Sequence, residues 1–422
     1  MQKIISFLKI LGPGLITGAS DDDPSGIATY SQTGAQFGYQ QLWGTLWTIP
    51  LMTTMQEMSG RIGIVTGKGI GGVLKQYYPK PVLYIAMISL LIANIINIGA
   101  DLGAITSAAK LLIPLPTFIL LIATIFLIIL TQIFIPYKTY EKYLKWLAIA
   151  LLTYIVETLI LHQDWLKILK STLIPYFSFN KDYLINLTAF LGTTISPYLF
   201  FWQSNQEVEK RIALKRQKSH EVNKSRVSKK DIFGLRIDTI IGMTFSNLIA
   251  FFIIASTASI LASHGITSIN TASEAAQALK PLAGNFAYIL FALGVIGAGL
   301  LAIPVLAGSA SYAVSSTFSL KEGLGKKLQN APVFYGIIIA SIILGALVNF
   351  TPIPPFKLLY YSAAVNGLAS PFLIVLILLI VNNKQIMGKH TNPKLLNILG
   401  IITALLMGIT SIALLYSLKS SV

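Results

Sequence analysis

The chain has 422 residues, no cysteine and few charged residues, and both shortages limit what the protein can be. Without cysteine it has no disulfides, thiolate metal sites or iron–sulfur clusters. Only 11% of its residues are charged, whereas an ordinary globular domain carries about 25%. Because 54% of the residues are hydrophobic and the mean hydropathy is +0.70, the sequence predicts an all-α integral membrane protein.

Histidine is also scarce. The four histidines, His162, His220, His264 and His390, lie in connections or at the ends of predicted spans, so no imidazole ligand or histidine proton relay is expected at mid-membrane. With no cysteine, no mid-membrane histidine and no His-Glu-x-x-His pattern, the chain offers no catalytic set. We therefore expect a protein that is not an enzyme and needs no cofactor.

The formal net charge of +16 would suggest nucleic acid as a partner if the chain were soluble. Most of the 32 lysines and arginines lie in or beside the alternate connections that share a side with the N-terminus. Such an asymmetry sets the orientation of a membrane protein. We expect a multi-pass protein of the cell (plasma) membrane with a cytoplasmic N-terminus and an outside C-terminus. Its partners would be the lipid bilayer and an ion, with no nucleic acid and no obligate protein partner.

Hydropathy predicts eleven transmembrane helices in a single polytopic domain. They span roughly residues 11–38, 41–63, 81–110, 115–136, 143–162, 183–205, 236–263, 281–318, 332–350, 355–381 and 394–416. The most hydrophilic connection, 205–236, is strongly basic and is expected to be a solvated cytoplasmic loop, with binding of anionic lipid headgroups as the alternative.

The first span contains the segment Ala19-Ser20-Asp21-Asp22-Asp23-Pro24-Ser25-Gly26. A charge at the bilayer centre costs at least about 2.5–3.5 kcal/mol, so carboxylates at this depth indicate a functional site. Pro24 removes an amide donor and Gly26 adds backbone freedom, and both favour a break in the helix. Irregular backbone at membrane depth is tolerated where it faces protein or a water-filled cavity.

The sixth span has a similar interruption, Thr193-Thr194-Ile195-Ser196-Pro197-Tyr198. The two interrupted spans lie five spans apart and therefore enter the membrane in opposite directions. Matching interruptions in two halves point to a mid-membrane site formed by an inverted repeat. We predict five plus five helices, in repeats of about 11–162 and 183–381, with 394–416 as an additional helix.

The two breaks together offer oxygen ligands for a cation. Asp23 supplies a carboxylate, and the carbonyl of Ser20 is expected to leave the regular helix. Pro197 lacks the amide that would bond the carbonyl of Thr193, and the hydroxyls of Ser196 and Tyr198 flank that break. An all-oxygen set suits magnesium, calcium or manganese.

Other polar residues within the spans have more than one possible role. Asp101 and Asn97 lie one helical turn apart in the third span and either line the ion path or form helix–helix hydrogen bonds. Asp21 and Asp22 either concentrate cations at the site or are solvated. Glu57 precedes Arg61 by four residues, which favours a structural ion pair.

Methionines 52, 55 and 58 recur at helical spacing in the second span. A thioether metal site is the alternative here, but packing in the protein interior is favoured.

At these residues the sequence resembles the natural resistance-associated macrophage protein family of divalent metal transporters. The resemblance covers nearly the whole chain and is clearest at Gly12-Pro13-Gly14, Asp23-Pro24, Gly60-Arg61-Ile62-Gly63-Ile64-Val65-Thr66-Gly67-Lys68, Gly99-Ala100-Asp101 and Arg236-Ile237-Asp238-Thr239. It implies a five-plus-five inverted-repeat fold of the LeuT type and transport of manganese or ferrous iron, usually with protons. The family's metal ligands are an Asp-Pro-Gly-Asn motif on the first helix and a Met-Pro-His motif on the sixth.

This chain departs from that pattern at the ligands themselves. Gly26 stands where the resemblance places an asparagine ligand, Ser196 replaces the methionine, and Tyr198 replaces the neighbouring histidine. A later histidine of the sixth helix aligns with Gln203, and an acid of the third helix aligns with Ala104. These departures resemble the prokaryotic branch of the family that transports magnesium, whose ion is thought to keep much of its hydration.

We therefore expect alternating-access transport of Mg²⁺, with Mn²⁺ as a further ion, and no proton coupling. The alternative is a proton-coupled Mn²⁺/Fe²⁺ transporter of the main family, which would need a device to select against magnesium. An amino-acid carrier on the same fold is disfavoured because Asp23 would repel the substrate carboxylate. A gated channel is a further alternative, and the inverted repeat favours alternating access over it.

Overall fold

The computed structural model describes residues 17–18, 20–135, 139, 152–160, 163–217, 227–280 and 284–419. These ranges contain helices and connections and no strand. The helices are α3 (Pro24–Phe37), α4 (Trp43–Thr66), α5 (Ile70–Tyr77), α6 (Lys80–Leu112), α7 (Thr117–Phe134), α9 (Thr153–Ile160), α10 (Trp165–Leu173), α11 (Lys181–Thr194), α12 (Pro197–Gln217), α13 (Lys229–Ile260), α14 (Ala272–Ala276), α16 (Ala287–Phe318), α17 (Pro332–Leu347), α18 (Pro355–Asn382), α19 (Lys384–Met387) and α20 (Lys394–Lys419).

The distribution of side chains is that of a protein surrounded by lipid. In the described ranges, eight helical segments are long and apolar enough to cross a membrane, with α11 and the first part of α12 counted as one. Large apolar side chains such as Phe126 of α7 and Ile412 of α20 are exposed, while carboxylates such as Asp23 and Asp101 are buried. Apolar surface outside and polar groups inside suit a hydrocarbon solvent, where unpaired polar groups are costly.

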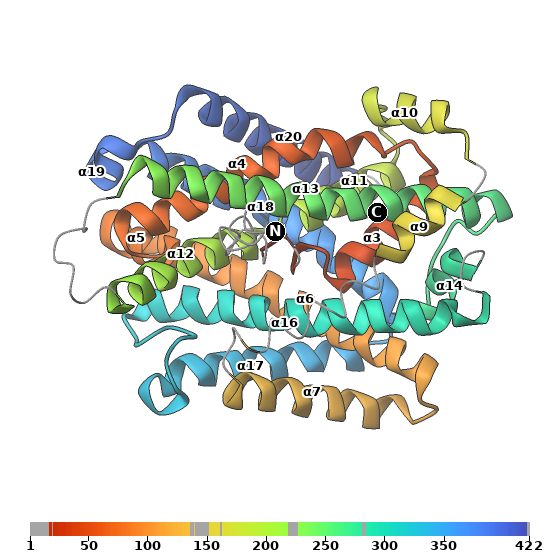
Figure 1. Ribbon diagram of the computed structural model, residues 1–422, viewed down its shortest axis with the longest axis horizontal. Coiled ribbons are helices and arrows are strands. Elements are labelled where there is room, and N and C mark those ends of the chain that lie inside the picture. Colours follow the sequence, from red (N-terminus) through yellow and green to blue (C-terminus); the bar gives the residue numbers. More distant parts are fainter. Residues whose placement is uncertain are drawn as a thin grey trace, which may run out of the picture.

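The long helices lie side by side along the longest axis of the molecule, as Figure 1 shows. Extensive packing joins α6 to α16, α11 to α18, α12 to α4, and α13 to both α3 and α4. The short helices α5 and α19 lie at one end of the bundle, whereas α10 and α14 lie at the other (Figure 1). Connections predicted to share a side of the membrane therefore gather at the same end.

The helix positions agree closely with the predicted spans where the structure describes them. For example, α6 covers 80–112 where hydropathy predicted 81–110, and α18 covers 355–382 where it predicted 355–381. Of the predicted span 143–162, only 152–160 is described, and residues 11–16 of the first span also lie outside the described ranges.

The prediction of a loop over 205–236 is wrong for both of its ends. Helix α12 continues to Gln217, and α13 begins at Lys229 after a capping box formed by Ser228 and Asp231. Hydropathy falls where a helix leaves the hydrocarbon, but lysine, arginine, glutamate and glutamine are good helix formers and let the helix continue in water. Residues 218–226 lie outside the described ranges.

Both predicted helix breaks are present. Asp23 is the N-cap of α3, in an extended conformation with φ −69° and ψ 170°, and Pro24 occupies the first helical position. Proline is favoured there because its missing N–H would have no intrahelical partner in any case. In the second half, α11 ends at Thr194, and α12 begins at Pro197 after two residues of irregular backbone.

Candidate metal-ion site

Asp23 is fully buried and both of its carboxylate oxygens accept hydrogen bonds. Its Oδ1 accepts from the Ser25 hydroxyl at 2.6 Å and from the Gly26 backbone N–H at 2.7 Å. Its Oδ2 accepts from the Asn97 side-chain amide of α6 at 3.0 Å. The N-terminal end of α3 also carries partial positive charge, which favours an ionised carboxylate at this cap.

Asn97 extends this network to a third helix, because its Oδ1 accepts from the Ser362 hydroxyl of α18 at 2.9 Å. Asp101 lies one turn further along α6 and is fully buried. Within the described ranges its oxygens have no hydrogen bond of regular geometry, although the Ser25 backbone N–H interacts with the carboxylate. Asp101 and Asp23 are close enough to repel each other, which places two carboxylates at the same break.

The break between α11 and α12 lies directly against the break at Asp23. The Ser25 hydroxyl is 3.5 Å from that of Thr193, and the Tyr30 hydroxyl is 3.2 Å from that of Thr194. The structure therefore brings together the two interruptions that lie about 170 residues apart in the sequence, as Ser25 and Thr193 are 168 positions apart.

The backbone carbonyls that the sequence predicts as cation ligands accept hydrogen bonds from hydroxyls of the chain itself. Ser196 Oγ donates to the carbonyl of Thr193 at 2.7 Å and to that of Gly192 at 2.9 Å. Tyr198 donates its hydroxyl to the carbonyl of Ser20 at 2.9 Å. A proline break leaves carbonyls without amide partners, and the nearest hydroxyls have taken over that role. Ser196 and Tyr198 thus hold the two breaks in shape.

Gly26 leaves a narrow space lined by oxygen atoms. A Cβ atom at this position would lie 3.2 Å from the Asp21 carbonyl oxygen and 3.3 Å from Thr193 Oγ1. Both contacts are tighter than ordinary van der Waals distances, so the absence of a side chain lets these oxygens face the backbone beside Asp23.

Asp21 and Asp22 are buried and not solvated, which excludes one of the two predicted alternatives. Ser246 of α13 donates to Asp21 Oδ2 at 2.8 Å and to Asp22 Oδ1 at 3.1 Å. Across the described ranges, none of the buried aspartates 21, 22, 23 and 101 is in an ion pair with lysine, arginine or histidine. A buried carboxylate without a basic partner is stabilised by a bound cation or by protonation.

Gln203 lies away from this cluster. Its side chain bonds Thr17 Oγ1 at 2.5 Å and Glu207 Oε1 at 3.5 Å, two turns along α12 from the break. It thus links α12 to the segment that precedes Asp23.

The structural roles predicted for Glu57, Arg61 and the three methionines of the second span are confirmed. Glu57 pairs with Arg61 within α4, and Arg236 of α13 joins the pair at 2.9 Å. Methionines 52, 55 and 58 are all buried in the core, as the packing interpretation predicted. His264 and His390 lie at span ends as predicted, while His162 and His220 lie outside the described ranges.

The chemistry available at this break is that of two carboxylates, Asp23 and Asp101, among neutral oxygens. In the part of the chain that the structure describes, no three histidine, cysteine, aspartate or glutamate side chains come together as a metal cluster. A cation held here would depend on Asp23 with hydroxyl, amide and backbone oxygens, and on water. Such a set is typical of hard ions that keep part of their hydration.

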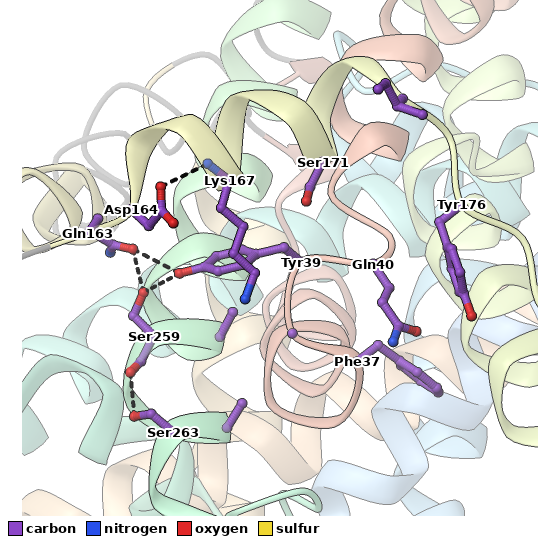
Figure 2. Close-up of a pocket in the computed structure, with 14 residues that line it drawn as sticks. Phe37, Tyr39, Gln40, Gln163, Asp164, Lys167, Ser171, Tyr176, Ser259 and Ser263 are labelled. Carbon is purple, nitrogen blue, oxygen red and sulfur yellow. Dashed lines mark hydrogen bonds between the residues drawn. The ribbon is translucent and has the colours of Figure 1, made fainter.

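The pocket in Figure 2 is a different feature, at the opposite end of α3. It has a volume of about 710 Å³ and includes Tyr39, Gln163 and Ser259, whose side chains hydrogen-bond one another. Lys167 lies over the Tyr39 ring with Nζ 5.7 Å from its centroid. Since α3 has 14 residues, this pocket lies about 20 Å along the helix from Asp23 and is not the ion site.

The comparisons with known proteins agree with this arrangement. The family model described as "Natural resistance-associated macrophage protein-like" matches residues 14–417. This chain belongs to the Nramp family. A relative from Yersinia enterocolitica, "Divalent metal cation transporter MntH", is 26% identical to this Nramp protein over 407 residues, which cover 93% of this chain and 91% of the relative.

Two solved structures show the same fold at low sequence identity. The manganese transporter of Eremococcus coleocola matches with a TM-score of 0.77 at 18% identity, covering 97% of this Nramp protein and 87% of that chain. The inward-facing conformation of Mhp1 matches with a TM-score of 0.51 at 13% identity, covering 97% and 91%. The predicted all-α fold of the LeuT type is thereby confirmed.

Sequence reasoning missed several residues of this site. Ser25 lies inside the first break and was detectable from its position beside Asp23. Ser246 and Ser362 lie in long apolar helices, where an isolated polar residue gives no signal of what it faces.

Proposed function

We propose that this Nramp protein transports divalent metal cations across the membrane by alternating access, with Mg²⁺ as its ion. The observation that carries the proposal is the position of Asp23, buried where two helix breaks meet and bonded by hydroxyl and amide groups. Magnesium dehydrates reluctantly and is usually bound through one or two carboxylates plus water. A site with the carboxylates of Asp23 and Asp101 among neutral oxygens fits that requirement.

Proton-coupled transport of manganese or iron is the second candidate. The name of the structural neighbour, a manganese transporter, supports manganese as the ion, and the Yersinia relative is named for divalent metals in general. In this chain, however, Ser196 and Tyr198 stand where the resemblance places methionine and histidine, and both hydroxyls bond backbone carbonyls. The soft ligands that favour manganese over magnesium are therefore replaced by groups that shape the backbone.

We further propose that uptake is driven by the metal gradient and the membrane potential, without stoichiometric proton movement. Gln203 does not titrate, and Ala104 provides no acid near Asp101 on α6. The potential supplies about 4.6 kcal/mol for two charges crossing ~100 mV, from ~2.3 kcal/mol per charge.

The membrane placement is part of the same proposal. The protein would lie in the plasma membrane as one domain of two inverted repeats, with its N-terminus and the ends carrying α5 and α19 in the cytoplasm. The basic residues of those connections support this orientation, because positive charge is retained on the cytoplasmic side.

Reconstitution in liposomes tests ion and coupling together. Initial uptake of Mg²⁺, Mn²⁺ and Ca²⁺ is measured with and without an inside-negative potential, while a trapped dye reports internal pH. We expect Mg²⁺ uptake that rises with the potential and leaves internal pH unchanged. Metal-dependent acidification that Asp101→Asn abolishes would instead establish the proton-coupled alternative.

Asp23→Asn tests the site itself. The variant keeps the size of the side chain and removes the charge that offsets dehydration of the ion, so uptake should fall to near background. Thermal unfolding in detergent checks that the variant is folded, because an asparagine can still accept from Ser25 and Gly26. A folded variant that transports at the original rate would show that the ion binds elsewhere.

A further inference from the structure

The side chain of Asn366, in the middle of α18, is fully buried and unpartnered. Neither its Nδ2 nor its Oδ1 forms a hydrogen bond with any described residue. Burying an amide without partners is costly, and buried polar groups almost always find a partner in the protein, in water or in a ligand. Asn366 is therefore expected to form hydrogen bonds with water or a ligand and not with the side chains around it.

The neighbours of Asn366 on α18 show which way it faces. Ser362, Asn366 and Ser370 are each one turn apart, so their side chains share one stripe of the helix. Ser362 Oγ donates to Asn97, which bonds Asp23. This end of the stripe therefore reaches the carboxylate of the candidate ion site.

The other end of the stripe reaches the second helix break. Ser370 Oγ donates at 3.2 Å to the carbonyl of Ile195, between α11 and α12. Asn366 lies between the two serines on this stripe, and thus between the Asp23 network and the α11–α12 break.

Close packing fixes this orientation of α18. A Cβ atom at Gly367 would lie 2.5 Å from the carbonyl oxygen of Thr188, so the backbones of α18 and α11 are in direct contact beside Asn366. Rotation of α18 about its axis would make the two backbones clash, so this packing keeps the stripe of Ser362, Asn366 and Ser370 on its present side.

We propose that Asn366 is a specificity-determining residue whose Oδ1 accepts a hydrogen bond from a water molecule bound to the cation at Asp23. The proposal rests on the proposed function and deepens it, since it names a residue that would contact the water shell of the transported ion. An ion that retains its inner waters is recognised through hydrogen-bond acceptors around that shell. Asn366 supplies such an acceptor from a helix that does not contain either break.

The decisive variant is Asn366→Leu, which has a similar size and makes no hydrogen bonds. In proteoliposomes we expect the KM for Mg²⁺ to rise about tenfold, the usual effect of losing one hydrogen bond to the bound species. The KM for Mn²⁺, which exchanges its water more readily, should rise less. The melting temperature should stay the same or increase, because no hydrogen bond within the protein is lost.

Asn366→Ser is the second variant, chosen because the smaller side chain fits the site whatever its shape, and it should also raise the KM. Asn382→Leu is the matched control, since Asn382 lies at the exposed end of the same helix and bonds Asn397 at 2.9 Å. That control should leave both KM values unchanged.

Two results would overturn the inference. One is an unchanged KM for every transported ion in folded Asn366→Leu and Asn366→Ser. The other is a large drop in melting temperature in both variants with an unchanged KM in the remaining folded protein, which would make Asn366 a structural residue. Failure of the proposed function looks different: wild-type vesicles that take up Mn²⁺ and no Mg²⁺ refute magnesium as the ion, and Asn366 is then judged on its Mn²⁺ KM.

Discussion

Gly26 determines how much space the backbone leaves beside Asp23. Its Cα faces the carbonyl oxygen of Asp21 and the hydroxyl of Thr193, at distances where even one methyl group is crowded. A glycine here thus matters for packing at the candidate ion site as well as for the helix, because any side chain would crowd these two oxygens.

Gly26→Ala should therefore weaken ion binding while the fold persists. We expect the KM for Mg²⁺ to rise about tenfold, equivalent to about 1.4 kcal/mol of lost affinity. The control is Gly336→Ala in α17, where no atom lies within 4 Å of the new Cβ. That variant should transport normally and be stabilised by about 0.5–1 kcal/mol. Equal KM values for the two variants would contradict an oxygen-lined space at Gly26.

At the scale of the helices, Glu57 joins α4 to α13. It accepts from Arg61 within α4 and from the guanidinium of Arg236 at 2.9 and 3.0 Å. Glu57 and Arg61 are almost inaccessible, whereas the Arg236 side chain is 41% exposed. Loss of either Glu57 or Arg61 would strongly destabilise the protein, because the other charge would remain buried without its partner.

Glu57→Gln should destabilise the protein by about 3–5 kcal/mol, since Arg61 keeps its buried charge without a counter-charge. Arg236→Gln should cost less than about 1 kcal/mol, because that side chain is partly solvated and Glu57 keeps Arg61. Thermal or denaturant unfolding of the two variants in detergent measures the difference. Equal losses of stability in the two variants would contradict the expectation that burial makes the Glu57–Arg61 pair more important to stability than Arg236.

For the molecule as a whole, Glu209 connects the end of α12 to the segment between α16 and α17. Its carboxylate accepts from the backbone N–H groups of Leu324 at 2.7 Å and Gly325 at 3.0 Å. In the same segment, burial raises the pKa of the Glu322 carboxyl to about 7, the negative Glu209 adds to the rise, and Ser316 and Lys326 oppose it.

The raised pKa of Glu322 makes stability depend on pH. The folded state holds this proton more tightly than the unfolded state, whose carboxyl titrates near 4.5, so stability falls as pH rises from about 4.5 to 7. Glu322→Gln removes the penalty and should raise the free energy of unfolding by at most about 3 kcal/mol at pH 8, and by less at pH 5. The free energy of unfolding of variant and wild type is measured at pH 5 and pH 8. An equal stability difference at the two pH values would show that the raised pKa of Glu322 is not its cause.

The sequence by itself determined the membrane class, most of the span positions and both helix breaks. These features follow from local properties: the hydropathy of about 20 residues predicts a span, and Pro24 and Pro197 end helices wherever they occur. Asp23 was identifiable for the same reason, since a carboxylate at membrane depth is unusual without any knowledge of its neighbours. The ends of α12 and α13 were not predicted, because hydropathy reports where a helix leaves lipid and not where it stops.

Only the tertiary structure decided which residues surround Asp23. Asn97 and Ser362 are 265 positions apart, and no local pattern indicates that they bond each other. Likewise, only the structure shows that the Ser196 hydroxyl donates to a carbonyl of its own helix break. Only the structure shows that Asn366 is buried without a hydrogen-bond partner among the described residues. The physical reason is that a side chain's chemistry is fixed by its sequence, whereas the direction in which it points and the groups it meets depend on how distant helices pack.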